Sequence, residues 1–439
     1  MAEALHLEPG FAWLDGDAVE QRIFSRPLAV LCATGSKVVV QGPGGRAVFE
    51  ERALDVLEAA LAAWGGPPGG MLVGFLGYEL VSELEALPLP PPRDFEFPDL
   101  WLGLFDSFLS WEPGGWRFLG TDAWRGQDGF PYPPVRAENR LIAAQRVDPI
   151  QNPAGALSVG PVRSRPNRSD FAAGVSRTIA RIVDGELFQT NLCRRLEVPL
   201  AASAAWPLYF RMRKSNPARY GAFLRLGPSR CVLSMSPELF LKASDGGVES
   251  RPIKGTRPRG KNAREDLALA EELKNSEKDR AELAMIVDVV RNDLGRVCAA
   301  GSVRVESYAD LLSLPTVHHT SATITGRLRH DRDIVDLLRA TFPPASVTGA
   351  PKIQAIQVAL EQERQRRGPA MGAMGWISLD GGLQLSVAIR TAVVTGGRVL
   401  YCAGSGITAG SDPDQELEET SAKAQAFVRA LGLPCEPVP

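Results

Sequence analysis

The sequence predicts an α+β fold with a large, mostly antiparallel sheet system. Three observations indicate this class. Short apolar runs are separated mainly by Gly turns, a few long segments with helical spacing lie between groups of these runs, and strands do not alternate regularly with helices. Regular alternation would favour a parallel βαβ sheet, whereas short Gly turns are typical of antiparallel neighbours.

The first part of the chain predicts strands and one helix. Three short strands (LAVLC, KVVV and AVF) fall within 27–49, and leucines at helical spacing predict a helix over 51–64. The segments MLVGFLGYEL and LWLGLFDSFLSW follow as buried strands. A polar stretch over 145–168, rich in Pro and Gly, has no periodicity and is the best boundary. We therefore expect an amino-terminal region over 1–150 and a second region over 165–430.

The second region begins with a predicted helix that is followed by a strand. Ser169 can cap this helix, whose apolar residues fall on one face and which ends at Gly185. In the strand over 187–200, Gln189 and Arg195 share one face, so a polar row lies on one side of the sheet. Further strands are expected over 221–226, 230–234, 238–243, 303–307, 372–379, 384–394 and 398–403, and further helices over 264–296, 332–341, 351–366 and 413–431.

Composition and charge exclude several classes of protein. The 49 Lys and Arg against 51 Asp and Glu give a net charge of −2, which leaves no overall positive field for nucleic acid or an anionic membrane. The six cysteines lie far apart without a CxxC pair, which favours reduced thiols. The acidic amino terminus and the lack of a long apolar run predict no targeting segment and no membrane span. We expect a cytoplasmic protein with no nucleic-acid or membrane partner.

Two segments contain cations in positions that favour binding of an anion. The segment RPIKGTRPRGK has a restricted backbone that presents Lys254, Arg257 and Arg259, and such a loop suits an anionic ligand. Taken alone, the same pattern is more often a solvated basic turn. In TGAPK, Lys352 lies in the first turn of a helix, where the macrodipole disfavours a cation, and a bound anion would explain it.

Two pairs of acids are each spaced to share one face of a helix. Asp279 and Glu282 lie on a helix that Ser276 can cap, and Glu416 and Glu419 lie on another. Acids in a first helical turn also complement the macrodipole without any ligand. If both helices point at the same place, four carboxylates without local cations make a hard-cation site. Because no His or Cys is spaced with them, Mg²⁺ suits the site better than zinc.

Three further patterns narrow the chemistry. The turn from Gly404 to Gly406 offers backbone N–H groups that suit a carboxylate. His318 and His319 are adjacent in a strand-like segment, so they face opposite ways and only one should serve a site. No cysteine occupies a GxCxG elbow, and neither GxSxG nor HExxH occurs, so covalent acyl chemistry is not indicated.

Six motifs together resemble the chorismate-utilising enzymes: GELFQTNL, PIKGTRPRG, MIVDVVRNDLGRV, SVTGAPK, VAIRTAVV and GSGITAGSDPDQELEETSAKA. The match is dense over 169–428. Residues 1–150 look like the amino-terminal part shared by anthranilate synthase component I and aminodeoxychorismate synthase component I. The resemblance implies one α+β body like anthranilate synthase component I, in which a central β-sandwich is decorated with helices and the two regions intertwine.

Position by position, the resemblance implies a metal site and a chorismate pocket. The implied Mg²⁺ ligands are Glu282 and Glu419, supported by Asp279 and Glu416. The implied substrate contacts are Gly255, Thr256, Arg390, the Gly406 backbone and Lys423. Glu238 matches the general acid that protonates the leaving C4 hydroxyl, and His319 matches the active-site histidine of the family. The metal would orient the ring carboxylate of chorismate.

Two positions distinguish members of the family. Water-adding members place a lysine base where this chain has Gln189, which implies that the incoming nucleophile is ammonia. Anthranilate synthases usually read PIAGT where this chain reads PIKGT, and Lys254 is the signature of the aminodeoxychorismate synthases. In the implied mechanism this lysine attacks C2 as the C4 hydroxyl leaves, and ammonia then adds at C4 and expels the lysine.

The chain also departs from the family at two places. It has Ala370 where an aromatic residue is common, and LCATG over 31–35 matches the tryptophan-binding segment of anthranilate synthases only loosely. The leading hypothesis is an aminodeoxychorismate synthase subunit that takes ammonia from a separate glutaminase subunit, because no cysteine here is placed as a glutaminase nucleophile. The alternatives are anthranilate synthase component I and a non-catalytic chorismate-binding partner. The four carboxylates and Lys254 argue against the second, because a binding protein needs neither.

Overall fold

Two large antiparallel sheets form the centre of the computed structural model, which describes residues 5–8, 10–16, 21–42, 44–65, 70–88, 90–112, 115–120 and 157–434. The first sheet has the order β10 (Arg163–Arg165), β11 (Gln189–Pro199), β23 (Arg398–Ile407), β22 (Thr391–Thr395), β13 (Arg230–Ser236), β12 (Tyr220–Gly227), β1 (Ala12–Gly16), β2 (Gln21–Phe24), β8 (Ser107–Glu112) and β9 (Gly115–Gly120), and β19 (Gly349–Ala350) pairs with β11.

The second sheet has the order β16 (Ile253–Pro258), β18 (Val317–Arg327), β15 (Gly247–Arg251), β14 (Leu239–Ser244), β21 (Leu383–Val387), β20 (Ala373–Ser378), β6 (Met71–Leu76), β7 (Leu100–Phe105), β3 (Ala29–Thr34), β4 (Lys37–Gly42) and β5 (Gly45–Phe49), and β17 (Arg304–Ser313) pairs with β18. All the pairings of these strands are antiparallel. The predicted fold class is confirmed.

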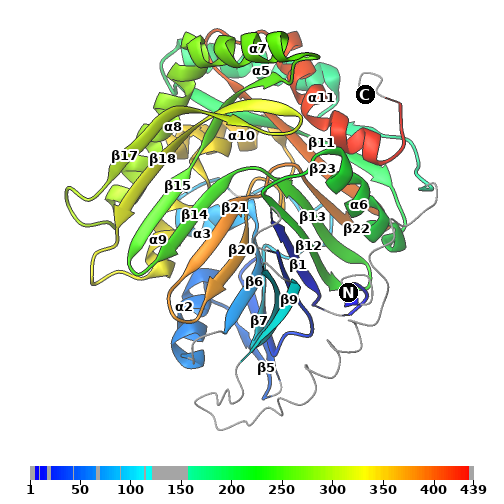
Figure 1. Ribbon diagram of the computed structural model, residues 1–439, viewed down its shortest axis with the longest axis vertical. Coiled ribbons are helices and arrows are strands. Elements are labelled where there is room, and N and C mark those ends of the chain that lie inside the picture. Colours follow the sequence, from blue (N-terminus) through cyan, green and yellow to red (C-terminus); the bar gives the residue numbers. More distant parts are fainter. Residues whose placement is uncertain are drawn as a thin grey trace.

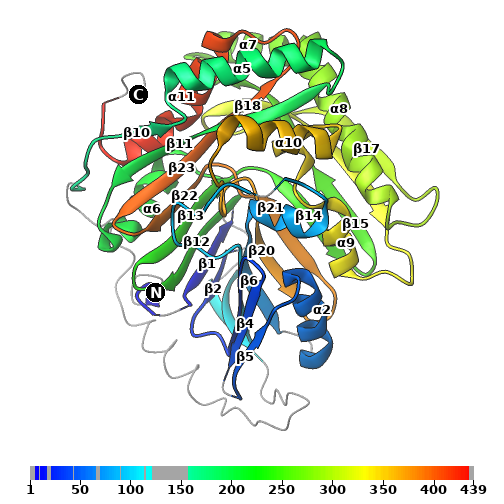
Figure 2. The ribbon, with the colours of Figure 1, turned by 180° about the vertical axis from the view of Figure 1, so that it is seen from behind.

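Helices cover the outer faces of both sheets (Figures 1 and 2). The α-helices are α2 (Ala53–Trp64), α3 (Val81–Leu84), α5 (Arg168–Val183), α6 (Ala205–Ser215), α7 (Ala263–Asn275), α8 (Glu277–Gly295), α9 (Ile334–Thr341), α10 (Lys352–Glu363) and α11 (Pro413–Ala430), with short 3₁₀ turns η1 (Tyr78–Leu80), η2 (Ala202–Ala204) and η3 (Ala345–Val347). Helices α5, α7, α10 and α11 gather at the upper end in Figure 1, and α2 lies toward the opposite end.

The core between the sheets joins segments that are far apart in the sequence. Phe24 lies with its ring centroid 5.2 Å from that of Phe105 and 5.1 Å from that of Phe108. The same apolar cluster includes Leu224 of β12 and Met374 of β20. Because β1 pairs with β12 and β6 pairs with β20, strands from before residue 121 and after residue 156 contribute to each sheet. Part of the expected boundary over 145–168 lies outside the described residues, as does Cys435.

The start of α5 differs from the sequence expectation. Asn167, not Ser169, caps this helix, since the Asn167 side chain accepts a hydrogen bond from Asp170 N at 2.9 Å. The Ser169 hydroxyl instead donates to Asn167 Oδ1 at 2.8 Å. The asparagine therefore satisfies the free backbone donors, and the serine supports the asparagine.

Two other expected elements are each divided in two. The helix expected over 264–296 is α7 and α8, separated by Ser276, whose extended backbone ends one helix while its side chain accepts from Asp279 N and caps the next. The strand expected over 384–394 is β21 and β22, which lie in different sheets. Between them Arg390 has a φ of +51°, which is unfavourable for a residue other than glycine and turns the chain from one sheet to the other.

Candidate active site

The predicted site residues converge where β11, β16 and β23 meet α8 and α11. A Cβ atom placed on Gly406 of β23 would lie 2.4 Å from Gln189 Nε2 and 3.8 Å from Lys254 Nζ. The charges of Glu282 on α8 and Glu419 on α11 both act on the Lys254 amine. Three strands and two helices that are far apart in the sequence thus place their polar groups around one point.

Lys254 is a partly buried amine on the edge strand β16. Its Nζ donates a long hydrogen bond of 3.4 Å to the Ser346 carbonyl oxygen. Burial lowers the pKa of Lys254, and although the Glu282 charge opposes this shift, the net direction is downward. A lowered pKa increases the fraction of neutral amine, which is the nucleophilic form of a lysine.

Gln189 and Gly406 face each other across neighbouring strands. Gln189 is 1% exposed, and its Oε1 is buried without a hydrogen-bond partner in the part of the chain that the structure describes. The close approach of Gln189 Nε2 leaves no space for a side chain at position 406, so glycine is required there. A buried acceptor without a partner, beside a partly exposed glycine, indicates a place where a ligand donates a hydrogen bond.

Glu238 is a buried carboxyl next to Lys254. Its side chain accepts a 3.4 Å hydrogen bond from Ile253 N, and burial raises its pKa to about 7. The charges of Lys254 and Arg390 act against this shift. A carboxyl with this pKa is partly protonated near neutral pH, so it has a proton to give, as a general acid must.

His319 holds the backbone of β16 at its bulge between Lys254 and Thr256 and lies against Arg390. Its Nδ1 is 2.9 Å from the Gly255 carbonyl oxygen and 3.0 Å from Thr256 Oγ1, and its Nε2 is 3.3 Å from Arg390 Nη2. Since the guanidinium can only donate, Nε2 accepts and Nδ1 carries the proton. Burial lowers the pKa of His319 to about 4, and the Arg390 charge adds to this, so the ring is neutral.

His318 faces the other side of the strand, as its position next to His319 predicts. Its Nε2 lies 3.0 Å from Asp266 Oδ1, and Ser313 Oγ lies 2.9 Å from its Nδ1. Both partners belong to elements that pack against β18. The side chain is 2% exposed, so His318 is a structural histidine.

The four predicted metal-site carboxylates do not share one environment. Asp279 lies 3.2 Å from Arg257, and Glu419 lies 2.6 Å from Lys423. The expectation of a site without local cations is therefore wrong. Although desolvation acts to raise it, the Lys423 ammonium holds the pKa of Glu419 below its ordinary value. A further cation, Lys278, was not expected from the sequence, and its charge acts on Glu282, Glu416 and Glu419.

The donor set nevertheless suits Mg²⁺. Glu282 and Glu419 interact through their charges, and Glu416 has one buried oxygen, Oε2, without a hydrogen-bond partner among the described residues. Its other oxygen accepts from Ser411 Oγ at 2.6 Å. No group of three or more ligand side chains in the described ranges is arranged to hold a metal ion by itself. Mg²⁺ commonly takes one or two carboxylates and completes its shell with substrate oxygens and water, so two facing glutamates are enough.

Two predicted anion contacts are occupied by the protein itself. Lys352 Nζ lies 2.5 Å from Asp293 Oδ2 and also donates to the carbonyl oxygens of Thr341 and Pro343. Arg259 pairs with Asp266 at 2.7 Å. In both cases a carboxylate on a helix of this chain takes the place of the expected external anion. Arg257 pairs with the site carboxylate Asp279, so Lys254 is the one cation of the three expected from RPIKGTRPRGK that is not held in an ion pair with a carboxylate of the described residues.

Two partners in the site were not singled out from the sequence. The Ser346 carbonyl accepts from Lys254, and Asn216 Oδ1 accepts from Arg390 Nη1 at 3.3 Å. Ser346 is the first residue of the quoted motif SVTGAPK, so the motif carried a signal. Asn216 lies in no such motif, and only the fold brings it to Arg390.

The model of the chorismate-binding enzyme family matches residues 8–429. The chain belongs to this family. The match extends over both sequence regions and confirms the resemblance that the motifs carried. None of the helices in the described ranges is long and apolar enough to cross a membrane.

Relatives with two different names are similar to this chain at nearly the same sequence identity. The chain is 36% identical over 365 residues to aminodeoxychorismate synthase component 1 of Salmonella typhimurium, which covers 83% of this chain and 77% of that protein. It is 38% identical over 384 residues to anthranilate synthase component 1 of Streptomyces coelicolor, covering 84% and 74%. The crystal structure of anthranilate synthase component I from Streptococcus pneumoniae matches with a TM-score of 0.80 at 28% identity, covering 94% of this chain and 93% of that chain. The predicted fold, that of anthranilate synthase component I, is confirmed.

Proposed function

We propose that this member of the family is an aminodeoxychorismate synthase component 1, which converts chorismate and ammonia to 4-amino-4-deoxychorismate. The observation that carries the proposal is the pairing of a nucleophilic lysine with a protonated acid. Lys254 has a lowered pKa, and Glu238, whose pKa is about 7, is close enough for the two charges to interact. Overall identity does not separate this activity from that of the anthranilate synthases, whereas Lys254 in PIKGT favours aminodeoxychorismate synthase.

The two residues divide the first half of the reaction between them. The neutral Lys254 amine attacks C2 of the ring, and the C4–O bond breaks as the double bond shifts. Glu238 gives its proton to the departing hydroxyl, which leaves as water. Ammonia then forms the bond to C4, and the bond between C2 and Lys254 breaks. Gln189 supplies no base, and ammonia needs none because it is already nucleophilic.

The rim of the site binds the charged parts of chorismate. Arg390 and Lys423 would pair with its carboxylates. The backbone of Gly406 and that of Gly255 and Thr256 would form hydrogen bonds with the substrate at close range. The neutral His319 fixes the latter backbone through the Gly255 carbonyl oxygen. These contacts orient the ring so that C2 faces Lys254 and C4 faces Glu238.

Four carboxylates would hold the metal, with Glu282 and Glu419 as direct ligands and with Asp279 and Glu416 supporting them. When bound, Mg²⁺ would neutralise the ring carboxylate and stabilise the charge that develops as the hydroxyl leaves. Glu419 must exchange its partner Lys423 for the metal, which frees the Lys423 ammonium for a substrate carboxylate. The metal and the substrate would therefore bind cooperatively.

The ammonia would come from a separate glutaminase subunit in the cytoplasm. Cys193, Cys231 and Cys402 are buried, and burial raises the pKa of each thiol, which is the opposite of what a nucleophilic cysteine needs. The names of the relatives, which call them component 1, support a second component. Glutamine-dependent activity should appear only when such a subunit is added.

The test is the product formed by the purified chain from chorismate, Mg²⁺ and ammonium. We expect aminodeoxychorismate, detected as 4-aminobenzoate once a lyase is added. Release of anthranilate as the main product would contradict the proposal and favour the other named relatives. No consumption of chorismate under any of these conditions would favour a binding role.

A further inference from the structure

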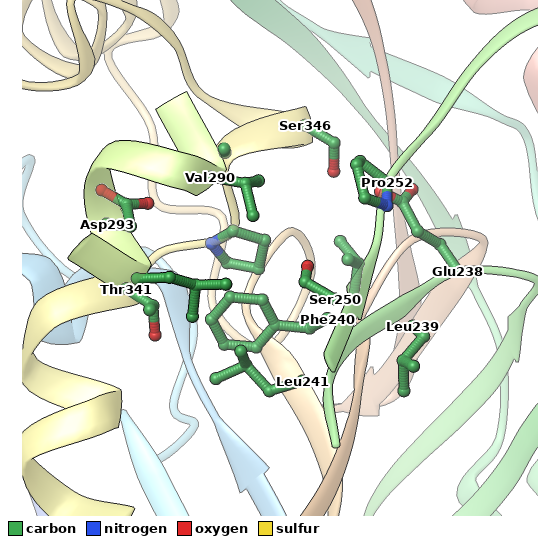
Figure 3. A pocket seen from close by; sticks show the side chains of 14 residues that line it. Glu238, Leu239, Phe240, Leu241, Ser250, Pro252, Val290, Asp293, Thr341 and Ser346 are labelled. Carbon is green, nitrogen blue, oxygen red and sulfur yellow. The ribbon is translucent and has the colours of Figure 1, made fainter. Parts of the chain in front are cut away.

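A small cavity borders Glu238 on the side of α8 (Figure 3). It has room for about one water-sized molecule. Phe240 and Leu241 of β14, Val290 of α8 and Val387 of β21 form apolar walls. All of these side chains are buried. In Figure 3 Glu238 and Pro252 lie on one side of the cavity, and Asp293 and Thr341 lie on the other.

The polar groups on the two sides differ in whether they are satisfied. On the far side, Asp293 is paired with Lys352 and the Thr341 hydroxyl donates to the Leu337 carbonyl oxygen at 2.7 Å. On the near side, Ser346 Oγ is buried, and among the described residues only Glu238 is close enough to interact with it. The Ser346 hydroxyl lies close enough to the Glu238 carboxyl to interact with it, and this interaction opposes the rise of the Glu238 pKa. A buried hydroxyl with hydrogen-bonding capacity to spare therefore lies beside Glu238.

Ser346 also connects this side of the cavity to the nucleophile, because its carbonyl oxygen accepts from Lys254 Nζ. The cavity, the acid and the lysine thus meet at one residue. A molecule in the cavity would be next to the carboxyl that protonates the C4 hydroxyl. It would be separated from solvent by buried apolar side chains.

We propose that this cavity is the binding site of the ammonia that attacks C4, an inference that rests on the proposed function. The leaving hydroxyl and the incoming nitrogen share the same carbon, so the nucleophile has to wait beside the group that releases the hydroxyl. Ammonia has three N–H donors, which match the Glu238 carboxylate and Ser346 Oγ, and its lone pair remains free. The apolar walls disfavour the ammonium ion, because burying a charge there is costly.

Protons balance over the whole cycle. After Glu238 has protonated the hydroxyl, it is a carboxylate and accepts a hydrogen bond from the bound ammonia. The ammonia nitrogen bonds to C4, the bond between C2 and the Lys254 nitrogen breaks, and Lys254 leaves as the amine that first attacked. The new C4 ammonium group then returns one proton to Glu238. The net reaction consumes chorismate and ammonia and releases water and the aminated product.

The experiment compares three variants in the full chain. Val290→Leu fills the cavity, and Ser346→Ala removes the hydroxyl that lines it. Val287→Leu is the control, because Val287 is buried on the same helix but does not line the cavity. The readouts are the KM for ammonia, the KM for chorismate, and the rate at which chorismate labels Lys254 without ammonia. The melting temperature of each variant reports folding.

We expect both cavity variants to raise the KM for ammonia by about tenfold, the equivalent of one lost hydrogen bond. The KM for chorismate and the labelling of Lys254 should stay within about twofold of the wild type, since both variants keep Glu238 and Lys254. The control should leave all three values near those of the wild type. If Val290→Leu does not fold, Val290→Ala replaces it and should raise kcat/KM for methylamine relative to ammonia, because it widens the same space.

Two results would overturn the inference while leaving the proposed function intact. One is an unchanged KM for ammonia in both cavity variants of an active enzyme. The other is a parallel loss of Lys254 labelling and chorismate binding, which would make the cavity part of the chorismate site. Failure of the wild type to form aminodeoxychorismate from ammonium would instead overturn the proposed function itself, and the ammonia site with it.

Discussion

The inner part of the site, formed by Glu238, His319 and Lys254, favours neutral side chains, whereas the rim of the site contains ion pairs. In the inner part, burial raises the pKa of Glu238 to about 7, lowers that of His319 to about 4 and lowers that of Lys254, so each is moved toward its neutral form. At the rim, Glu419 forms an ion pair with Lys423, and Asp279 forms one with Arg257. The inner groups are therefore suited to proton transfer and attack, and the rim groups to binding ions.

The largest effect on activity is expected for Lys254, the amine in the inner part of the site. Lys254→Ala should abolish formation of aminodeoxychorismate and leave the melting temperature nearly unchanged, because a partly buried lysine on an edge strand contributes little packing. Lys261→Ala is the matched control, since it removes an exposed cation of the same segment. Product formation by the Lys254 variant at a rate near that of the wild type would show that the amine is not the nucleophile.

The inner acid should show the next largest effect. Glu238→Gln should lower kcat by about 10²–10⁴-fold, the usual contribution of general acid catalysis. Because Glu238 acts in its protonated form and its pKa is about 7, kcat/KM of the wild type should fall as the pH rises above about 7. This limb of the pH profile should be absent from the residual activity of the variant. A limb that persists unchanged belongs to another group.

Substitution of Glu419, a carboxylate at the rim, should weaken Mg²⁺ binding and leave the chemical step itself unchanged. Glu419→Gln should raise the Mg²⁺ concentration for half-maximal activity at least about tenfold, because Mg²⁺ affinity depends on the number of charged ligands. Glu418→Gln is a suitable control, since it removes a neighbouring exposed carboxylate from the same helix. Equal Mg²⁺ titrations of the two variants would exclude Glu419 as a ligand.

The smallest effect on activity is expected at His318, on the face away from the site. His318→Asn breaks the hydrogen bonds to Asp266 and Ser313 and should lower the free energy of unfolding by about 1–3 kcal/mol. Its kcat should stay near that of the wild type, whereas His319→Asn should lose most activity. Denaturant unfolding and steady-state kinetics of both variants measure this difference. A loss of kcat in His318→Asn without loss of stability would contradict the assignment of faces.

Local patterns were enough to predict the fold class and most elements. Gly turns between apolar runs indicated antiparallel sheets, and the alternation of side chains along a strand separated His318 from His319. The pattern failed at 384–394, where the apolar run continues through the crossing between two sheets. Nothing in the sequence near Arg390 announces a φ of +51°, because the surrounding sheets impose it.

The partners of the charged groups were predicted less well, because most lie far away in the sequence. Asp293 is 59 residues from Lys352, and no local spacing connects them. The pair of Glu419 and Lys423 is different, since a Glu four residues before a Lys on a helix is a known stabilising arrangement. That signal was present in the sequence and argued against carboxylates free of cations.

The central claim is that the Lys254 amine forms a bond to chorismate before ammonia arrives. Intact-protein mass spectrometry of the wild type with chorismate and Mg²⁺, but without ammonia, tests it most directly. We expect a mass increase equal to chorismate minus one water, mapped to the peptide that contains Lys254 and lost on addition of ammonium. An unmodified protein in a sample that turns over chorismate as soon as ammonium is added would contradict the account.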